Sequence, residues 1–187
     1  KFERPISDSI ALVTSQEPND EFIQEMHEAS PIFIKHIMPI MGAGEIEGDL
    51  DTDKVKLLEA VDEVTTMETG SKFAVQCRVI GAGLTYSAKD IEVYVGEAYY
   101  NRGNIPSFSD RDIINDDIEI ISILIHGKTY YVGFSKSSDN LNFHSDEHRI
   151  RARKGKREIS RAESKLIEAL STFKIELDGH GTALDLG

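Results

Sequence analysis

The sequence predicts an α+β fold, and three stretches of the chain carry that prediction. Residues 118–135 hold two runs of β-branched and aromatic residues separated by Gly127 and Lys128, the pattern of a β-hairpin. Residues 72–80 (KFAVQCRVI) form an apolar run of strand length. Residues 87–100 begin with two polar residues that can cap a helix, Ser87 and Asp90. Strands and helices therefore follow one another along the middle of the chain.

The first fifty residues predict a smaller α/β unit. Residues 10–15 have the composition of a short strand, and Asn19 or Asp20 can cap a helix that runs through Glu28. An extended apolar run follows over residues 31–41, interrupted by proline. We place the boundary between this unit and the next at residue 50.

A second helix is predicted to begin at Asp51 or Thr52. Four apolar residues then recur at helical spacing along one face. They are Val55, Leu58, Val61 and Val64.

The last 28 residues predict a helix followed by a buried strand. Ser160 and Glu163 form a capping box, and three apolar residues then recur at helical spacing, Leu166, Leu170 and Phe173. Residues 182–187 are apolar apart from one carboxylate, Asp185, which is typical of a central parallel strand ending at a ligand-binding turn.

Charge is distributed unevenly along this acidic chain, whose formal net charge is -12. Residues 1–148 contain 12 Lys and Arg against 27 Asp and Glu, whereas residues 149–187 contain 9 against 6. The segment 149–165 has the density of basic residues expected of a phosphate-contacting surface, although a solvated linker would have the same composition. Its candidate RNA-contacting residues are Arg151, Arg153, Lys154, Lys156, Arg157 and Arg161.

Composition bounds the class of protein. The chain has 40% hydrophobic residues but no apolar run near the roughly eighteen residues of a membrane span, so a soluble protein is expected. The first residues lack the apolar centre of a signal peptide, and the single cysteine, Cys77, has no partner for an internal disulfide. Both features favour a cytoplasmic location.

Two other groups of residues invite a functional interpretation that we do not favour. Gly81 and Gly83 follow a strand, but Tyr86 stands where a dinucleotide fingerprint needs its third glycine, so a simple turn is the better prediction. Residues 144–148 (HSDEH) combine imidazoles and carboxylates without a Cys partner or the spacing of a known zinc motif, and no metal site is predicted.

The middle of the chain resembles the THUMP domain, an RNA-binding module of RNA-modification enzymes. The resemblance rests on Phe73-Ala74-Val75 with Arg78, and on Tyr131-Val132-Gly133-Phe134 at the end of the hairpin. It implies a THUMP domain over residues 51–137, preceded by a ferredoxin-like unit over residues 1–50. A basic interdomain linker is then expected over residues 138–158.

The C-terminal part resembles the entry to FtsJ-type RNA methyltransferases. Ser160-Arg161-Ala162-Glu163-Ser164-Lys165-Leu166 matches the pattern Ser-Arg-Ala-x-x-Lys-Leu, and Asp185-Leu186-Gly187 matches the start of the turn that follows. The resemblance implies that residues 159–187 are the first helix and strand of a Rossmann-like methyltransferase domain. Lys165 would then be catalytic at the ribose hydroxyl, and Asp185 and Gly187 would border S-adenosylmethionine.

Together these resemblances imply the RNA-binding portion of an S-adenosylmethionine-dependent RNA ribose 2′-O-methyltransferase, with rRNA as the expected substrate. The chain itself is expected to be catalytically incomplete, because the rest of the cofactor loop would lie beyond Gly187. Its strand 182–186 is therefore expected to pair with another strand, on its own chain or on a second copy. The alternatives are a non-catalytic THUMP module of another RNA-modification enzyme and a TlyA-like methyltransferase acting elsewhere on RNA.

Overall fold

The computed structural model describes residues 2–7, 10–29, 34, 37–81, 83–107 and 118–139. The chain divides into two compact units, Lys1–Phe143 and His144–Gly187, and every described residue belongs to the first. Its elements, in chain order, are β1 (Phe2–Ser7), β2 (Ile10–Val13), α1 (Asn19–Ala29), β3 (Gly42–Glu45), α2 (Leu50–Val64), β4 (Lys72–Ile80), α3 (Ala88–Asn101), β5 (Ile105–Pro106), β6 (Glu119–His126), β7 (Thr129–Lys136) and the 3₁₀ turn η1 (Ser137–Asp139).

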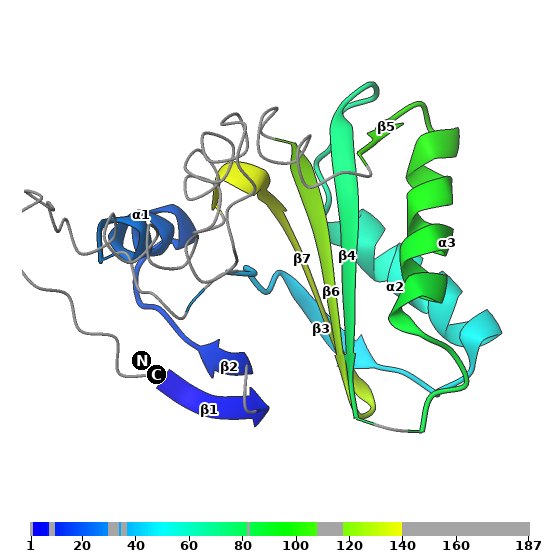
Figure 1. The fold of residues 1–187 in the computed structure, drawn as a ribbon, viewed down its shortest axis with the longest axis horizontal. Helices are drawn as coiled ribbons and strands as arrows, with labels where there is room; N and C mark the ends of the chain where they lie inside the picture. The colour runs from blue at the N-terminus through cyan, green and yellow to red at the C-terminus, as the bar shows by residue number, and fades with distance from the viewer. Residues whose placement is uncertain are drawn as a thin grey trace, which may run out of the picture. The chain divides into compact units, whose positions relative to one another are not determined.

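Five strands form a mixed sheet in the order β3-β7-β6-β4-β5. β4 pairs in parallel with β6 and with β5, while β7 pairs antiparallel with both β6 and β3. Helices α2 and α3 cover one face of this sheet, as Figure 1 shows. We call this the helix face and the opposite one the second face.

The core lies between the helices and the helix face of the sheet. Leu57 and Val61 of α2 and Ile91 and Val95 of α3 are fully buried there. From the sheet, alternate residues of β4, β6 and β7 enter the same core, as the two-residue period of a strand requires. They are Phe73, Cys77, Ile121, Ile123, Ile125, Tyr130 and Val132.

The elements with strong hydrophobic patterns are confirmed. β4 spans Lys72–Ile80 as predicted, and the hairpin turns at Gly127 and Lys128 between β6 and β7. Helix α3 follows Ser87, whose backbone N and side-chain Oγ both donate to Asp90 Oδ2, at 2.7 and 2.8 Å. The mixed α+β class is confirmed with them.

The start of α2 differs from the prediction. The helix begins at Leu50, and its N-cap is Asp49, whose side chain accepts a hydrogen bond from the Thr52 backbone N at 3.1 Å. The prediction of a start at Asp51 or Thr52 was wrong because three acidic residues near this position can all cap a helix. Asp49 is the cap because its carboxylate reaches the backbone N of Thr52, three positions further on.

Strand β3 was not predicted, since Gly42–Glu45 reads GAGE and glycine disfavours strands. Its glycines are explained by their neighbours. An ideal Cβ on Gly42 would lie 2.9 Å from Val132 Cγ2, and one on Gly44 would lie 2.6 Å from Tyr130 Oη. The large side chains of β7 fill the space that a β3 side chain would need. β3 therefore joins the sheet of residues 72–136 although it precedes the predicted boundary at residue 50.

The N-terminal part of the described chain contains the antiparallel pair β1-β2 and helix α1. α1 was predicted within one residue at its end, β2 is two residues shorter than expected, and β1 was not predicted because Pro5 and charged residues interrupt its pattern. None of the residues of α1 is buried. The ferredoxin-like assignment of this part remains a prediction.

Membrane-spanning helices were searched for over the described residues. None of the helices there is long and apolar enough to cross a bilayer.

Candidate functional site

The site residues predicted from the sequence lie outside the described residues. They are the catalytic candidate Lys165, the cofactor candidates Asp185 and Gly187, and the RNA candidates Arg151, Arg153, Lys154, Lys156, Arg157 and Arg161. Their roles remain predictions. The His-rich stretch 144–148 lies outside the described residues as well.

The residues that carry the THUMP resemblance are described, and most of them are packing residues. Phe73 is buried on β4, with its ring centroid 5.8 Å from that of Tyr99. Val132 is fully buried in the core, and Gly133 lies directly under the Pro39 carbonyl. Arg78 is different, because its side chain is exposed on the second face of β4. It is the motif residue that is free to contact a ligand.

Register places other polar side chains beside Arg78 on the second face. Arg78 pairs with Leu124 of β6, which pairs with Tyr131 of β7. In the next row Ile80 pairs with His126, which pairs with Thr129. The turn residue Lys128 adjoins this row and is exposed, as His126 is.

Hydrogen bonds fix the loops at this end of the sheet. The Gly127 backbone N donates to the Ile80 carbonyl at 3.2 Å, so the hairpin turn is tied to the end of β4. The Ile46 backbone N donates to the Lys128 carbonyl at 2.8 Å and ties in the end of β3. Gly81 and Gly127 have positive φ angles, 105° and 61°, which glycine adopts without strain. The end of the sheet is therefore held in one arrangement.

A buried carboxylate, Asp53, organises the loop before α2. Its two oxygens accept from the Glu47 and Gly48 backbone N atoms and from the Tyr86 hydroxyl, each at 2.8 Å. Burial, and then the adjoining Asp53 carboxylate, hold the pKa of Tyr86 above its usual value. Asp53 thus links the α2 loop to the α3 loop, and its full set of partners indicates a structural role.

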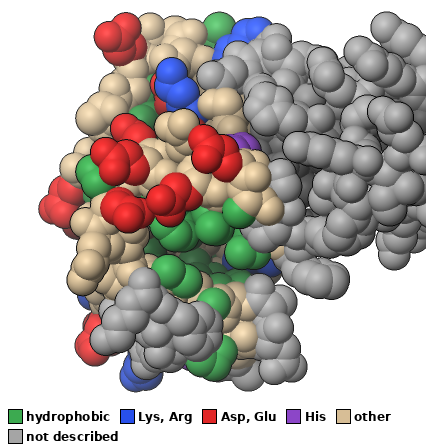
Figure 2. All heavy atoms as spheres, turned by 90° about the vertical axis from the view of Figure 1, so that its left-hand side faces the viewer, with side chains coloured by type: hydrophobic (Ala, Val, Ile, Leu, Met, Phe, Trp, Pro, Cys, Tyr) green, Lys and Arg blue, Asp and Glu red, His purple; other side chains and the backbone are tan. Residues whose placement is uncertain are grey.

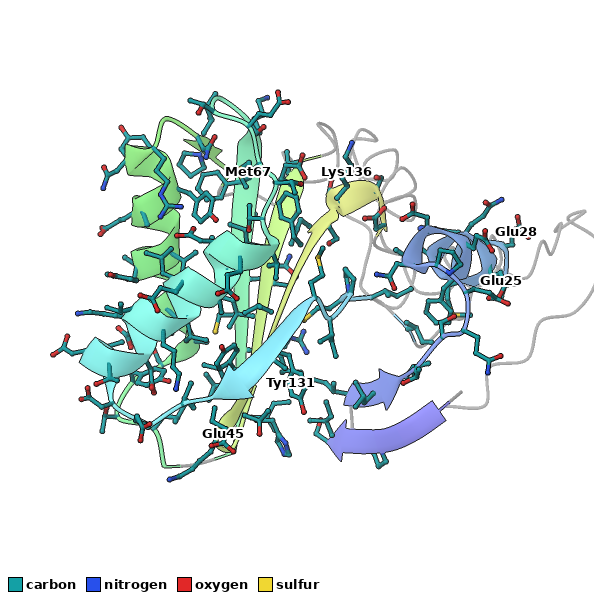
Figure 3. All side chains as sticks on the ribbon, turned by 180° about the vertical axis from the view of Figure 1, so that it is seen from behind. Glu25, Glu28, Glu45, Met67, Tyr131 and Lys136 are labelled. Atoms are coloured by element: carbon teal, nitrogen blue, oxygen red, sulfur yellow. The ribbon has the colours of Figure 1, made fainter. Side chains whose placement is uncertain are left out.

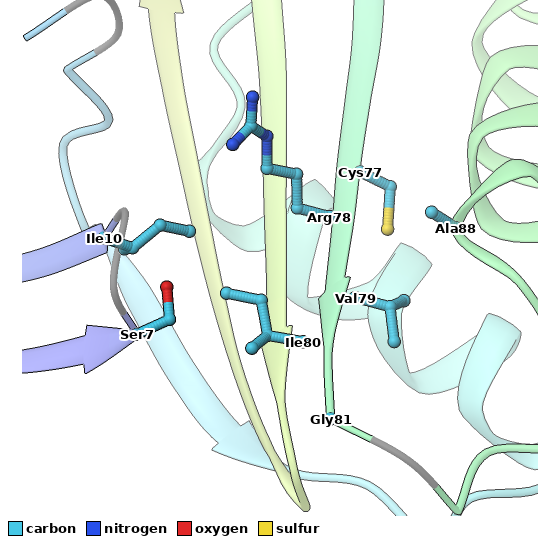
Figure 4. A pocket seen from close by; sticks show the side chains of 8 residues that line it. All are labelled: Ser7, Ile10, Cys77, Arg78, Val79, Ile80, Gly81 and Ala88. Carbon is cyan, nitrogen blue, oxygen red and sulfur yellow. The ribbon is translucent and has the colours of Figure 1, made fainter.

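An open depression of about 660 Å³ lies around the end of β4. Figure 4 shows Arg78 and Ile80 on one side of the strand and Cys77 and Val79 on the other. Ser7 and Ile10 complete the part of the wall beside the second face. Its volume falls within the range of small-ligand sites, roughly 300–1,000 Å³.

Cys77 lines this depression but is a poor nucleophile. Its thiol is buried, and burial, with a smaller contribution from Glu92, raises its pKa to about 12. At neutral pH the thiol is therefore protonated. Glu92 also accepts a hydrogen bond from the Cys77 backbone N at 3.0 Å.

The surface around these elements is mostly acidic. The described residues include 9 Lys and Arg against 20 Asp and Glu. Figure 2 shows acidic side chains gathered on one face of the molecule beside hydrophobic ones. Ion pairs join Lys54 to Asp51, Lys89 to Glu92 and Arg102 to Asp62. Within the described residues, neither Arg78 nor Lys128 has a carboxylate partner.

Sequence reasoning missed that Arg78 and Lys128, fifty positions apart, lie toward the same end of the sheet. The parallel pairing of β4 with β6 and the turn after β6 bring them to one end of the sheet. The turn itself was predicted, but the pairing partner of β4 was not. No cluster of three or more His, Cys, Asp or Glu side chains arranged to hold a metal ion occurs in the described ranges.

No protein-family model matches the sequence, and no curated protein matches it either. Among solved structures, the chain is similar to TrmN from Thermus thermophilus, with a TM-score of 0.51 and 12% sequence identity, over 86% of this chain and 50% of that one. PH1313 from Pyrococcus horikoshii Ot3 gives a TM-score of 0.46 and 17% identity, over 73% of this chain and 43% of that one. The chain therefore spans half or less of the length of these proteins. The likeness to TrmN is one of fold.

Proposed function

We propose that this chain is the RNA-binding portion of a THUMP-type RNA methyltransferase that uses S-adenosylmethionine. The proposal rests on one observation: the residues that carry the THUMP resemblance lie at packing positions in the fold. Phe73, Val132 and Gly133, which carry the THUMP resemblance, occupy positions that determine the packing of the sheet. The fold likeness to TrmN supports the same THUMP and methyltransferase type.

The finer proposal is methylation of a ribose 2′-hydroxyl, and it rests on the FtsJ-type signature alone. Lys165 is proposed to hold the hydroxyl oxygen and to lower the cost of negative charge developing on it. Asp185 and Gly187 are proposed to border the cofactor, which supplies the methyl group. The comparisons do not favour rRNA over tRNA, so the substrate is proposed only as a structured RNA. Cytoplasmic location and self-association through residues 182–186 are further predictions of the same kind.

The RNA-binding part of the proposal can be tested with the chain as it is. Binding of a fluorescent structured RNA is measured by anisotropy from 50 to 300 mM KCl. Because phosphate contacts release counterions, log K should fall linearly with log salt, with a slope of about -0.7 to -0.9 per contact. Replacing five of the six basic residues of the segment 149–157 by Gln should weaken binding and flatten the slope. The replaced residues are Arg151, Arg153, Lys154, Lys156 and Arg157.

The matched control is a chain in which residues 149–157 are scrambled, so that charge is kept and order is lost. It should bind as the wild type does, because phosphate contacts depend on charge more than on order. An unchanged slope in the neutralised variant would reduce this segment to a linker. Absence of any RNA binding by the wild-type chain at 50 mM KCl would overturn the RNA-binding function itself.

The catalytic part of the proposal is tested with the proposed parent enzyme, which contains a complete methyltransferase domain. Transfer of a radioactive methyl group to RNA, followed by digestion to nucleosides, distinguishes ribose from base methylation. Lys165→Ala should lower kcat far more than it raises KM, because Lys165 is proposed to act in the transition state. Lys174→Ala, a lysine outside the signature, is the control. Base methylation, or an unchanged kcat in Lys165→Ala, would remove the FtsJ-type mechanism and leave the RNA-binding proposal standing.

A further inference from the structure

Among the described residues, two exposed basic side chains without an ion-pair partner, with a histidine between them, lie toward one end of the sheet. They are Arg78, His126 and Lys128, which we call the β4-end patch. Arg78 lies on β4, His126 ends β6, and Lys128 lies in the turn that follows. All three side chains are exposed.

The geometry of the patch is set by strand pairing. Ile80 and His126 are direct partners in the β4–β6 ladder, and Arg78 lies two residues before Ile80, on the same face. The bond from the Gly127 backbone N to the Ile80 carbonyl then fixes Lys128 relative to both. Pairing and the turn therefore fix where the backbones of these residues lie, while their exposed side chains keep rotamer freedom until a ligand binds.

The depression beside Arg78 is a second feature of this end of the sheet. Arg78 and Ile80 line the depression of about 660 Å³, and Ile10 of β2 forms part of the same wall. The backbone of Gly81 is also part of that wall. A guanidinium group beside exposed backbone and apolar walls suits a flexible polyanion that also carries apolar groups.

Charge selects the kind of ligand. Acidic residues outnumber basic ones by about two to one in the described part of the chain, so a polyanion is repelled over most of that surface. At the end of the sheet, the exposed Arg78 and Lys128 offer cations to such a polyanion. We propose that the β4-end patch contacts the phosphate backbone of the RNA substrate, with Arg78 and Lys128 each neutralising a phosphate. This rests on the proposed RNA-binding function and assigns part of it to this end of the sheet.

The carboxylate of Glu45 lies near the patch and provides a further test of the proposal. Glu45 ends β3 directly opposite Thr129, and it points to the second face because the neighbouring Gly44 faces Tyr130 on the other side. It therefore belongs to the same row as Thr129, His126 and Ile80. Figure 3 shows Glu45 and Lys136 at opposite ends of the sheet, with Tyr131 between them. A phosphate at the β4-end patch would be repelled by Glu45.

The test uses the whole chain and the same fluorescent RNA. Arg78→Gln and Lys128→Gln should each weaken binding several-fold at 50 mM KCl and reduce the salt slope by about 0.7 to 0.9. Lys136→Gln is the matched control, since Lys136 is exposed on the same hairpin but lies at its other end. It should leave both quantities unchanged.

Replacing Glu45 should increase RNA affinity, whereas a folding defect would decrease it. Glu45→Gln should strengthen RNA binding at 50 mM KCl, and the gain should shrink as salt screens the repulsion. Glu59→Gln, an exposed acid on α2, is its control and should change binding little. Thermal unfolding of each variant confirms that the fold is kept.

Two outcomes separate this inference from the proposed function. If the wild type binds RNA but Arg78→Gln and Lys128→Gln behave like Lys136→Gln, the inference is wrong and the RNA-binding function stands. Competition by polyglutamate as effective as that by RNA, lost in the same two variants, would instead assign the patch to an acidic protein segment. That result would overturn the inference as well.

Discussion

At Gly133 the backbone of another segment passes so close to β7 that no side chain fits. An ideal Cβ there would lie 1.9 Å from the Pro39 carbonyl oxygen and 3.1 Å from its carbon. The chain before β3 is fixed in the same place, because the Met41 backbone N donates to the Val132 carbonyl at 2.9 Å. The glycine of the motif is thus explained by the close crossing of two backbones.

We expect Gly133→Ala to destabilise the protein by about 1–3 kcal/mol, as overpacking typically does. Urea unfolding followed by circular dichroism measures the change. Gly96→Ala on α3 is the control, because a Cβ at Gly96 meets nothing within 4 Å. It should stabilise the protein by about 0.5–1 kcal/mol, since alanine favours helix more than glycine does. Equal destabilisation by both changes would contradict this account.

A second residue, Cys77, allows a pH test. Its pKa is raised by burial from 9.0 to about 12, so the folded state keeps the proton that the unfolded state loses above pH 9. Stability should therefore be complete below pH 9 and fall as the pH rises toward 12.

Cys77 is the chain's single cysteine, so a thiol reagent reports on it alone. At pH 8 the native protein should react with Ellman's reagent far more slowly than the protein in urea. In Cys77→Val the loss of stability between pH 9 and 12 should be smaller than in the wild type. Fast labelling of the native protein would show that the thiol is accessible.

At the scale of elements, the sequence predicted the helices and strands that are specified by residues close together in the chain. Ser87 and Asp90 cap α3, and the alternation on either side of Gly127 gives the hairpin. It did not predict β3 or β5. The glycines of β3 make sense only beside Tyr130 and Val132, which are distant in sequence, and β5 is two residues long.

The same limit applies to the candidate site. Arg78 was noted within a motif, but its place at the same end of the sheet as Lys128 depends on which strand pairs with β4. A parallel partner is chosen by tertiary packing, and no local pattern specifies it. Asp53 was likewise missed, since its partners are backbone amides and a tyrosine 33 positions away.

The two helices are joined by a polar cluster that can be tested. Both Arg102 Nη1 and the Tyr99 hydroxyl donate to Asp62 Oδ1, at 2.5 and 2.9 Å, which links α3 to α2. Hydrogen bonding from Arg102 lowers the pKa of Asp62 below its usual value of 3.8. Its contribution to stability should therefore be present above pH 3.8 and disappear as the pH falls through the lowered pKa.

Asp62→Asn should lower the melting temperature at pH 7, and the difference from the wild type should shrink as the pH falls below 3.8 and through the lowered pKa of Asp62. Differential scanning calorimetry across this range measures it. Glu59→Gln, one turn earlier on α2, is the control. A difference that persists unchanged at low pH would mean that the carboxylate charge is not what joins the helices.

At the scale of the whole molecule, the excess of acidic residues should make salt act in opposite directions on folding and on RNA binding. Raising KCl from 20 to 300 mM should raise the melting temperature, because salt screens repulsion among the carboxylates. The same change should weaken RNA binding. Sucrose at equal osmolality is the control for RNA binding, because it does not screen charge. A melting temperature that falls with salt would show that attractive ion pairs dominate the folded state.

The sheet order β3-β7-β6-β4-β5 also has a consequence for synthesis on the ribosome. β3 and β4 are made early, but they are separated in the sheet by a hairpin that is made last. Until residue 136 has left the exit tunnel, neither strand has its main partner, and the apolar faces of α2 and α3 have no complete sheet to cover. Stalled nascent chains ending just after β5 should therefore be digested rapidly by protease, while release of about thirty further residues should make the same N-terminal region resistant in a single step.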